Sequence, residues 1–377
     1  MPESQAYDGV YVYLTNVAAF RPGDVVLTQN RYTRSAAVLR EAELIAARSG
    51  GDLSHVLICA ETPTFIEALA DGVGTVTFQA SFCHDLENVQ VLRYHNEDIA
   101  RAAADWAVHF HGQRYSVRKA RSAISGTDVD FRDDDGTFCS AFVADAYLNA
   151  GAREFEGTAA LKYRPASFEC IDGFQVITPT VFERGLALLN AETMTALDGD
   201  RASSPARDQR VLCRNFIESV ATDLDALFSS GDESRPQTFY GCLGYLRRSF
   251  QHRHGPQSED LTRLDDHLHE AMTDGRLDLM FKEIFAKDEP AIQRIIIESF
   301  EREPDFDLQD LRRMRGATLK QIEERSAVLG SASQRAAASK SWNRWLQLSL
   351  NVIHQLELRN VALGEVLSRV EACRWSR

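Results

Sequence analysis

One cysteine, Cys139, lies between an acidic, glycine-containing loop and an apolar run. Phe138 and Phe142 stand four residues apart and the run stops at Gly151, which predicts a helix with a glycine cap. Cys139 then occupies the first helical turn, where unpaired N–H groups and the helix dipole stabilise a thiolate over a thiol. The position predicts a thiol nucleophile, whereas a small cysteine packed in the core is the alternative for this residue taken alone.

Two upstream residues supply the remaining groups of such a site. Residues 54–60 predict a strand that carries His55 near its start, and residues 65–68 predict a second strand that carries Glu67. A hairpin of these strands can place the two side chains together. A thiol needs a base to take its proton, and the imidazole needs a third group to fix its tautomer. A structural histidine and a solvent-facing glutamate are the alternatives when each residue is considered alone.

Several short segments of the chain follow the order of motifs in a known family. In chain order they are 22–27, 54–56, 65–68 with 72–73, 112–115, 138–143 and 165–167. In this order they resemble the circularly permuted NlpC-type papain-fold thiol hydrolases, often called YiiX-like. Ordinary papain-fold enzymes place the cysteine before the histidine, whereas the permuted group places histidine first, the polar residue second and cysteine last. The resemblance covers roughly residues 8–180.

The resemblance implies a permuted papain-like fold with Cys139 as nucleophile, His55 as general base and then acid, and Glu67 as the group that orients the imidazole. It also implies that Tyr115 lines the site and helps to hold the substrate or the oxyanion; a half-buried aromatic with a solvated hydroxyl is the alternative. The chemistry would be two-step acyl transfer through an acyl-thioenzyme, with the backbone N–H of Cys139 as oxyanion donor.

The loop before the nucleophile, residues 128–136, is strongly acidic. Its charge disfavours a nearby thiolate, so we expect it either to point away or to serve another purpose. Recognition of a cationic substrate group is one hypothesis and a solvated loop is the other. The spacing does not fit a calcium loop, because Arg132 and Asp133 stand where a ligand and a glycine are needed.

Cys59 and Cys83 are the competing thiols. Cys59 shares the strand face of His55 but has apolar neighbours, and Cys83 precedes His84 without a helix start beneath it. The seven cysteines form no CxxC pair, which predicts free thiols in a reducing compartment.

Three histidine pairs with one intervening residue are present: His109 with His111, His252 with His254, and His267 with His269. Side chains two apart on a helix diverge and do not converge on one ion. We therefore expect no metal site and no cofactor.

Length and charge limit the function classes. A chain of 377 residues predicts two domains, which we place at 1–185 and 186–377. The net charge of −13 argues against nucleic acid as a partner. The N-terminus lacks the basic start and apolar run of a secretory signal, and no segment approaches the roughly 20 apolar residues of a membrane span. We expect a cytoplasmic protein without an integral membrane segment; signal-independent export or delivery as an effector stays open.

The first domain alternates helical and strand patterns, which predicts an α+β class: a small antiparallel sheet packed by helices. The second domain is predicted to be all-helical from about Phe182. We predict helices at 34–49 and from the Asn96 cap, and further strands at 73–78, 89–94 and 174–177. In the second domain the helical segments are 277–287, 290–300, 311–326 and 339–373.

The leading hypothesis is a cysteine hydrolase that cleaves peptide or isopeptide amide bonds. Cell-wall peptides are the substrate class that the resemblance implies, in tension with the missing export signal. A thiol acyltransferase or lipase acting on acyl lipids is an alternative, because lecithin:retinol acyltransferase-like enzymes share the permuted arrangement. An inactive papain-like binding module is the third. The helical half would serve as a lid, as the surface for a protein partner, or as a dimerisation unit.

Overall fold

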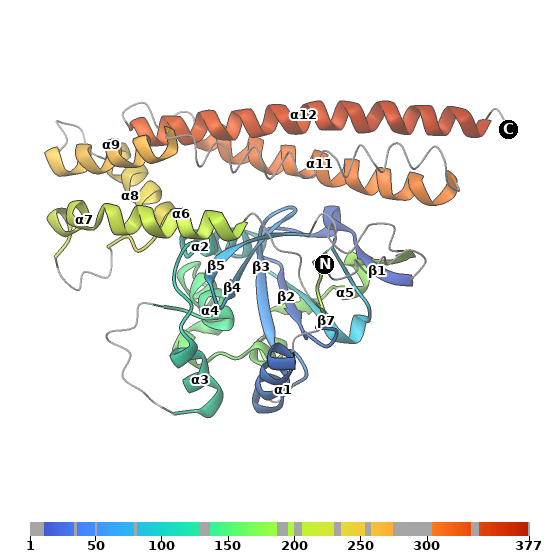
Figure 1. Ribbon diagram of the computed structural model, residues 1–377, viewed down its shortest axis with the longest axis horizontal. Helices are drawn as coiled ribbons and strands as arrows, with labels where there is room; N and C mark the ends of the chain where they lie inside the picture. The colour runs from blue at the N-terminus through green and yellow to red at the C-terminus, as the bar shows by residue number, and fades with distance from the viewer. Residues whose placement is uncertain are drawn as a thin grey trace. The chain divides into compact units, whose positions relative to one another are not determined.

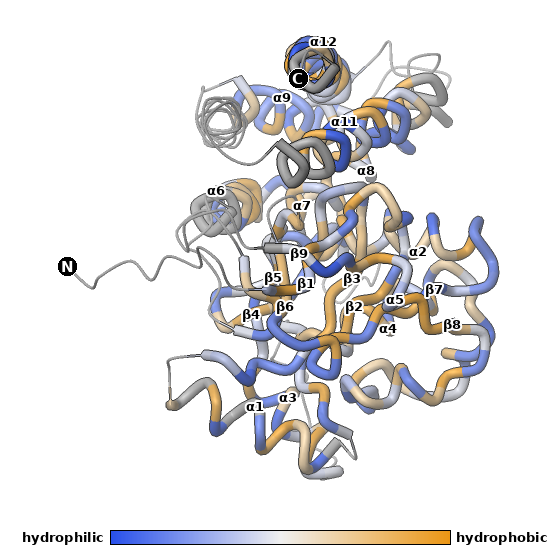
Figure 2. Tube along the Cα trace, turned by 90° about the vertical axis from the view of Figure 1, so that its right-hand side faces the viewer, coloured by the Kyte–Doolittle hydropathy of each residue, from blue (hydrophilic) through white to orange (hydrophobic). Residues whose placement is uncertain are grey.

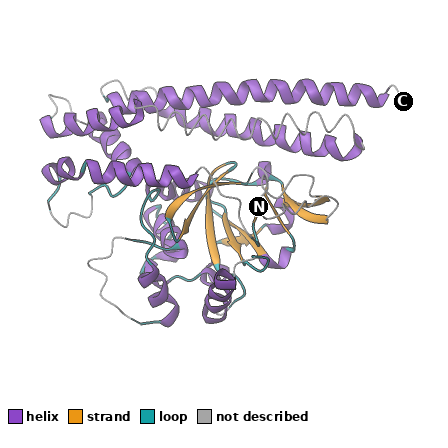
Figure 3. Cartoon of the chain, viewed as in Figure 1, coloured by secondary structure: helices purple, strands orange, loops and turns teal. Residues whose placement is uncertain are grey.

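The computed structural model describes residues 11–33, 36–49, 51–78, 81–127, 136–186, 195–199, 206–229, 235–252, 258–273, 304–332 and 339–375. Two compact units make up the chain, Met1–Arg210 and Val211–Arg377. The first is of the α+β class, and the described part of the second is helical (Figure 3).

Six strands of the described first unit form one antiparallel sheet in the order β5-β4-β3-β2-β7-β8 (Figure 1). These strands are β2 Val25–Thr28, β3 His55–Glu61, β4 Thr64–Leu69, β5 Gly72–Thr77, β7 Val89–Tyr94 and β8 Phe174–Val176. The central strands are hydrophobic along most of their length (Figure 2), and every residue of β2 is buried. Both faces of the sheet are therefore covered at its centre, and the predicted strands at these positions are confirmed.

A second sheet has the strand order β10-β6-β1-β9. Its strands are β1 Tyr11–Thr15, β6 Ser81–Cys83, β9 Phe182–Leu186 and β10 Thr195–Ala196. The prediction of a helical chain from about Phe182 is wrong for β9 and β10, because β9 pairs antiparallel with β1 and β10 pairs parallel with β6. The predicted boundary at residue 185 falls inside β9, and the first unit continues to Arg210.

The helices of the first unit are α1 Ala36–Ser49, α2 Glu97–His109, α3 Val117–Ser125, α4 Cys139–Asn149 and α5 Thr178–Val181. Short 3-10 segments lie at Val17–Ala19, Leu86–Asn88, Arg153–Phe155, Ala160–Lys162 and Pro165–Cys170. As predicted, the Asn96 side chain caps α2, accepting hydrogen bonds from the N–H groups of Asp98 and Ile99.

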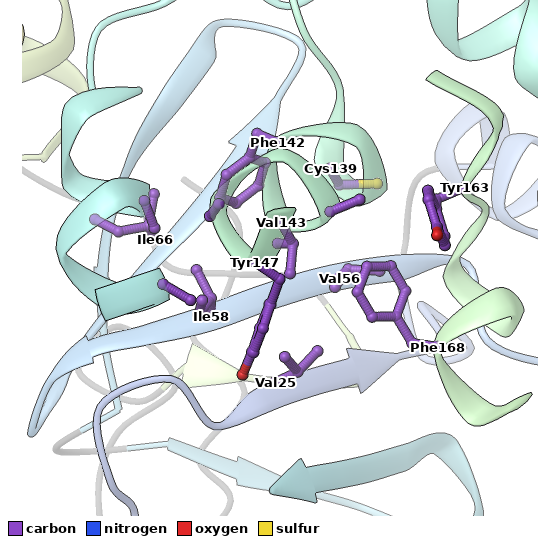
Figure 4. Close-up of a cluster of buried hydrophobic side chains, with 14 of the residues drawn as sticks. Val25, Val56, Ile58, Ile66, Cys139, Phe142, Val143, Tyr147, Tyr163 and Phe168 are labelled. Atoms are coloured by element: carbon purple, nitrogen blue, oxygen red, sulfur yellow. The ribbon is translucent and has the colours of Figure 1, made fainter. Parts of the chain in front are cut away.

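Helix α4 is buried on nearly all sides, as expected of a helix that is apolar around most of its circumference. Its residues Phe142 and Val143 pack over Val56 and Ile58 of β3 (Figure 4). Gly151, at φ +87°, follows the helix end as predicted, and Ala152 N–H donates to the Tyr147 carbonyl. The sheet and α4 thus share one core beneath the first helical turn.

The turn before β2 is tied directly to α4. Gly23 has φ +89°, and a Cβ there would collide with the Ala100 backbone, so glycine is required. The Tyr147 hydroxyl of α4 donates to the Gly23 carbonyl at 2.5 Å, inside the core. This bond fixes the height of α4 above β2 and hence the position of its first residue.

The second unit contains α7 Ala221–Leu227, α8 Phe239–His252, α9 Glu259–Thr273, α11 Pro304–Ala332, α12 Lys340–Trp375 and most of α6 Ala206–Ser219. Helices α11 and α12 pack along one another (Figure 1). Asp265 of α9 is buried and caps α12, accepting from the N–H groups of Lys340 and Ser341. Helices α11 and α12 confirm the predicted helical segments 311–326 and 339–373, whereas 277–287 and 290–300 lie outside the described residues.

Within the described ranges, every helix is either too short or too polar to cross a membrane.

We predict that Tyr147→Phe lowers the free energy of unfolding by about 1 to 2 kcal/mol, because the buried Gly23 carbonyl loses its donor. The matched control is Tyr11→Phe, whose side chain is exposed, and we expect a change within about 0.5 kcal/mol. Urea unfolding followed by circular dichroism measures both. Equal effects of the two variants would contradict the anchoring role of the Tyr147 hydroxyl.

Candidate active site

Cys139 is the first residue of α4, and the residue is 7% exposed. The N-cap residue, Phe138, makes no side-chain hydrogen bond to the helix start. Two backbone N–H groups donate to the Cys139 sulfur: that of Ser140 in the first turn of α4 and that of Val56 in β3. The pairs of β3 with β4 begin at Leu57, so the Val56 N–H lies just beyond that ladder.

The chain enters α4 along a fixed path. Thr137 N–H donates to the Arg114 carbonyl at 2.9 Å, and Ser116 N–H donates to the Thr137 carbonyl at 2.7 Å. The Lys119 ammonium donates to the Gly136 carbonyl at 2.7 Å. A Cβ at Gly136 would lie 3.0 Å from Ser116 atoms, so this close approach favours glycine. These contacts hold the backbone two residues before the nucleophile.

His55 and Glu67 meet across the β3–β4 hairpin. His55 is the first residue of β3, while Glu67 pairs with Leu57, two residues further along the same strand face. This diagonal relation brings His55 Nε2 to 3.1 Å from Glu67 Oε2. The two residues are 6% and 2% exposed, so the pair is almost entirely shielded from water.

The pKa of the Cys139 thiol lies below its ordinary value. Burial raises this pKa. The hydrogen bond to His55, the charge of that imidazole and the N–H groups of Val56 and Ser140 lower it, and together they outweigh the effect of burial. Because Nε2 of His55 faces Glu67, Nδ1 is the ring nitrogen left for the sulfur. An ionised Glu67 accepts the Nε2 proton, and the neutral ring then offers a lone pair at Nδ1, where the thiol proton can go.

The structure therefore brings together Cys139, His55 and Glu67. Tyr115 is half-buried and pairs through its backbone with Thr137, two residues before Cys139. That places it beside the segment leading to the nucleophile, and its contact with substrate stays a prediction. Residues 128–135 of the acidic loop lie outside the described residues.

The competing thiols differ from Cys139. Cys59 is fully buried in the middle of β3, opposite Phe65. Burial raises the pKa of Cys83, and the charges of Asp198 and Asp85 raise it further. The neighbouring His84 is held through Nδ1 by Asp198, at 2.8 Å. Cys83 is therefore a buried thiol whose surroundings oppose ionisation.

The N–H groups of Val56 and Ser140 were not predicted from the sequence as donors to the sulfur. Ser140 lies in the first helical turn, where such a donor is expected. Val56 directly follows His55, but its direction depends on where the β3–β4 ladder begins. Ser140 also donates its hydroxyl to the Tyr163 carbonyl at 2.8 Å, which anchors the first turn of α4.

Among the described residues, no group of three or more His, Cys, Asp or Glu side chains is arranged to hold a metal ion.

Comparisons with protein-family models, with curated proteins and with solved structures find no match. The geometry of the three residues is thus the basis for assigning a function.

We predict that Glu67→Gln raises the pKa of Cys139 toward the ordinary thiol value of about 8.5, because the imidazolium beside the thiolate loses its anionic partner. Alkylation of Cys139 by iodoacetamide should fall about tenfold at about pH 6 and converge with the wild-type rate above about pH 8.5. The control is Glu61→Gln at the other end of β3. A Glu67→Gln profile that superimposes on the control would contradict the orienting role.

Proposed function

We propose that the chain is a cysteine hydrolase that cleaves peptide or isopeptide amide bonds through an acyl-thioenzyme, on a permuted papain-like fold. The observation that supports this most is the buried hydrogen-bonded series of Cys139, His55 and Glu67 at the start of α4. Nucleophile, base and orienting carboxylate are the groups that thiol-dependent acyl transfer requires.

In the first half-reaction His55 takes the thiol proton, and the Cys139 sulfur attacks the substrate carbonyl carbon. The backbone N–H of Cys139, at the positive end of α4, can donate to the developing oxyanion. The imidazolium returns its proton to the leaving amine as the C–N bond breaks, which leaves a thioester. In the second half-reaction His55 deprotonates water, the hydroxide attacks the thioester, and the acid and the free thiol are released.

A second candidate is acyl transfer from, or hydrolysis of, acyl lipids by the same three residues. The observation in its favour is the apolar surroundings of the sulfur: the Cys139 side chain lies near Val56, Phe168 and Tyr163 (Figure 4). An aliphatic acyl chain would be compatible with those neighbours. The two candidates share the acyl-thioenzyme and differ in the donor and in the acceptor.

The test is intact-protein mass spectrometry after incubation with two panels, peptidyl aminomethylcoumarin amides and acyl p-nitrophenyl esters of increasing chain length. We expect an acyl adduct on Cys139, and Cys139→Ala should lower kcat/KM by at least about 10³-fold. Cys170→Ala, which removes an exposed thiol, is the matched control and should leave turnover unchanged.

Preference for amides supports the hydrolase, and a rate that rises with acyl chain length favours the lipid enzyme. Turnover that persists in Cys139→Ala would contradict both candidates. The absence of both adduct and turnover with either panel would also contradict them, and would favour the binding module.

A further inference from the structure

The helical unit carries a recess between α6 and α9. It has a volume of about 580 Å³ and is lined by Phe216, Ser219, His267, Glu270, Ala271 and Thr273. That volume lies in the range of small-molecule sites in proteins. Phe216 and Ala271 are the apolar residues of the lining, and Phe216 is largely buried and packs edge-on against Phe239. The other four lining residues are polar.

One of these polar groups is held in a defined orientation. His267 Nδ1 lies 2.6 Å from Asp223 Oδ2, and Arg263 Nε lies 2.5 Å from the other oxygen of the same carboxylate. Burial raises the pKa of Asp223, but the hydrogen bonds of Arg263 and His267 bring it below its ordinary value. The ionised carboxylate favours the tautomer with the proton on Nδ1, and in that tautomer Nε2 of this lining residue is an acceptor.

Glu270 stands three residues after His267, so their side chains share one face of α9 at neighbouring positions. Within the described part of the chain, neither His267 Nε2 nor the Glu270 carboxylate has a hydrogen-bonding or ionic partner. The recess therefore holds a carboxylate acceptor and an imidazole acceptor at neighbouring positions.

The two hydroxyls of the recess already use their protons. Ser219 Oγ donates to the Phe216 carbonyl at 2.7 Å, and Thr273 Oγ1 donates to the His269 carbonyl at 2.5 Å. This excludes Ser219 as an activated nucleophile for His267 in this arrangement, because its proton is directed away from the imidazole. It also means that all four polar side chains of the recess offer lone pairs.

A ligand for this recess must supply the hydrogen-bond donors itself. A primary ammonium has three N–H donors and a positive charge, which matches Glu270 and the Nε2 acceptor. An apolar or aromatic body attached to it would cover Phe216 and Ala271. We propose that the recess of the helical unit is a binding site for an organic primary amine with an apolar body, made by residues other than those of the thiol site.

The test is isothermal titration of the full chain at about pH 8 with three probes that share one phenyl body. These are phenethylamine, phenethyl alcohol and phenylacetate. We expect phenethylamine to bind, and the alcohol and the carboxylate to bind at least about tenfold more weakly. No binding of the amine, or equal binding of all three probes, would overturn the proposal.

Two variants of α9 locate the site. Glu270→Gln removes the anionic acceptor, and we expect the dissociation constant for phenethylamine to rise about tenfold. Glu259→Gln removes the same charge from the first turn of the same helix and should leave the constant unchanged. Equal effects would assign the binding to overall charge and overturn the site. A Cys139→Ala chain should bind the amine as the wild type does, so this result is independent of the thiol chemistry.

Discussion

The hydrogen bond between His55 Nε2 and Glu67 Oε2 is the interaction on which the rest of the thiol site depends. It occupies one nitrogen of a buried imidazole and leaves the other for the Cys139 sulfur. A buried carboxylate would be costly without a partner, and a buried histidine without one would have no fixed tautomer. The register of β3 and β4 places the two side chains diagonally, so that one hydrogen bond gives the carboxylate a partner and fixes the tautomer of the imidazole.

The ionisation of the Cys139 thiol depends on a balance between opposing effects. Burial disfavours the Cys139 thiolate, and it also keeps water from screening the groups that favour it. Those groups come from two different segments: His55 and Val56 at the start of β3, and Ser140 in the first turn of α4. The Tyr147–Gly23 bond and the contacts of Gly136 hold these segments in register. The fold as a whole therefore determines the chemistry of one sulfur atom.

Local patterns were sufficient to predict the elements that carry the three site residues. His55 and Glu67 lie on strands with strong apolar content, joined by a short turn, and Cys139 precedes an apolar run with a glycine cap. The sheet formed by β1, β6, β9 and β10 was not predicted, because its strands are short and pair across long stretches of chain. The recess between α6 and α9 was not predicted either, since it depends on how two helices pack rather than on a motif.

The most direct test of the account is site-resolved alkylation of the seven cysteines, measured by mass spectrometry as a function of pH in the wild type and in His55→Ala. The account predicts that Cys139 reacts fastest at about pH 6, well below the ordinary thiol pKa of about 8.5, and that His55→Ala removes this advantage. A Cys139 that reacts no faster than the other thiols, with no response to His55→Ala, would contradict an activated thiolate at this site.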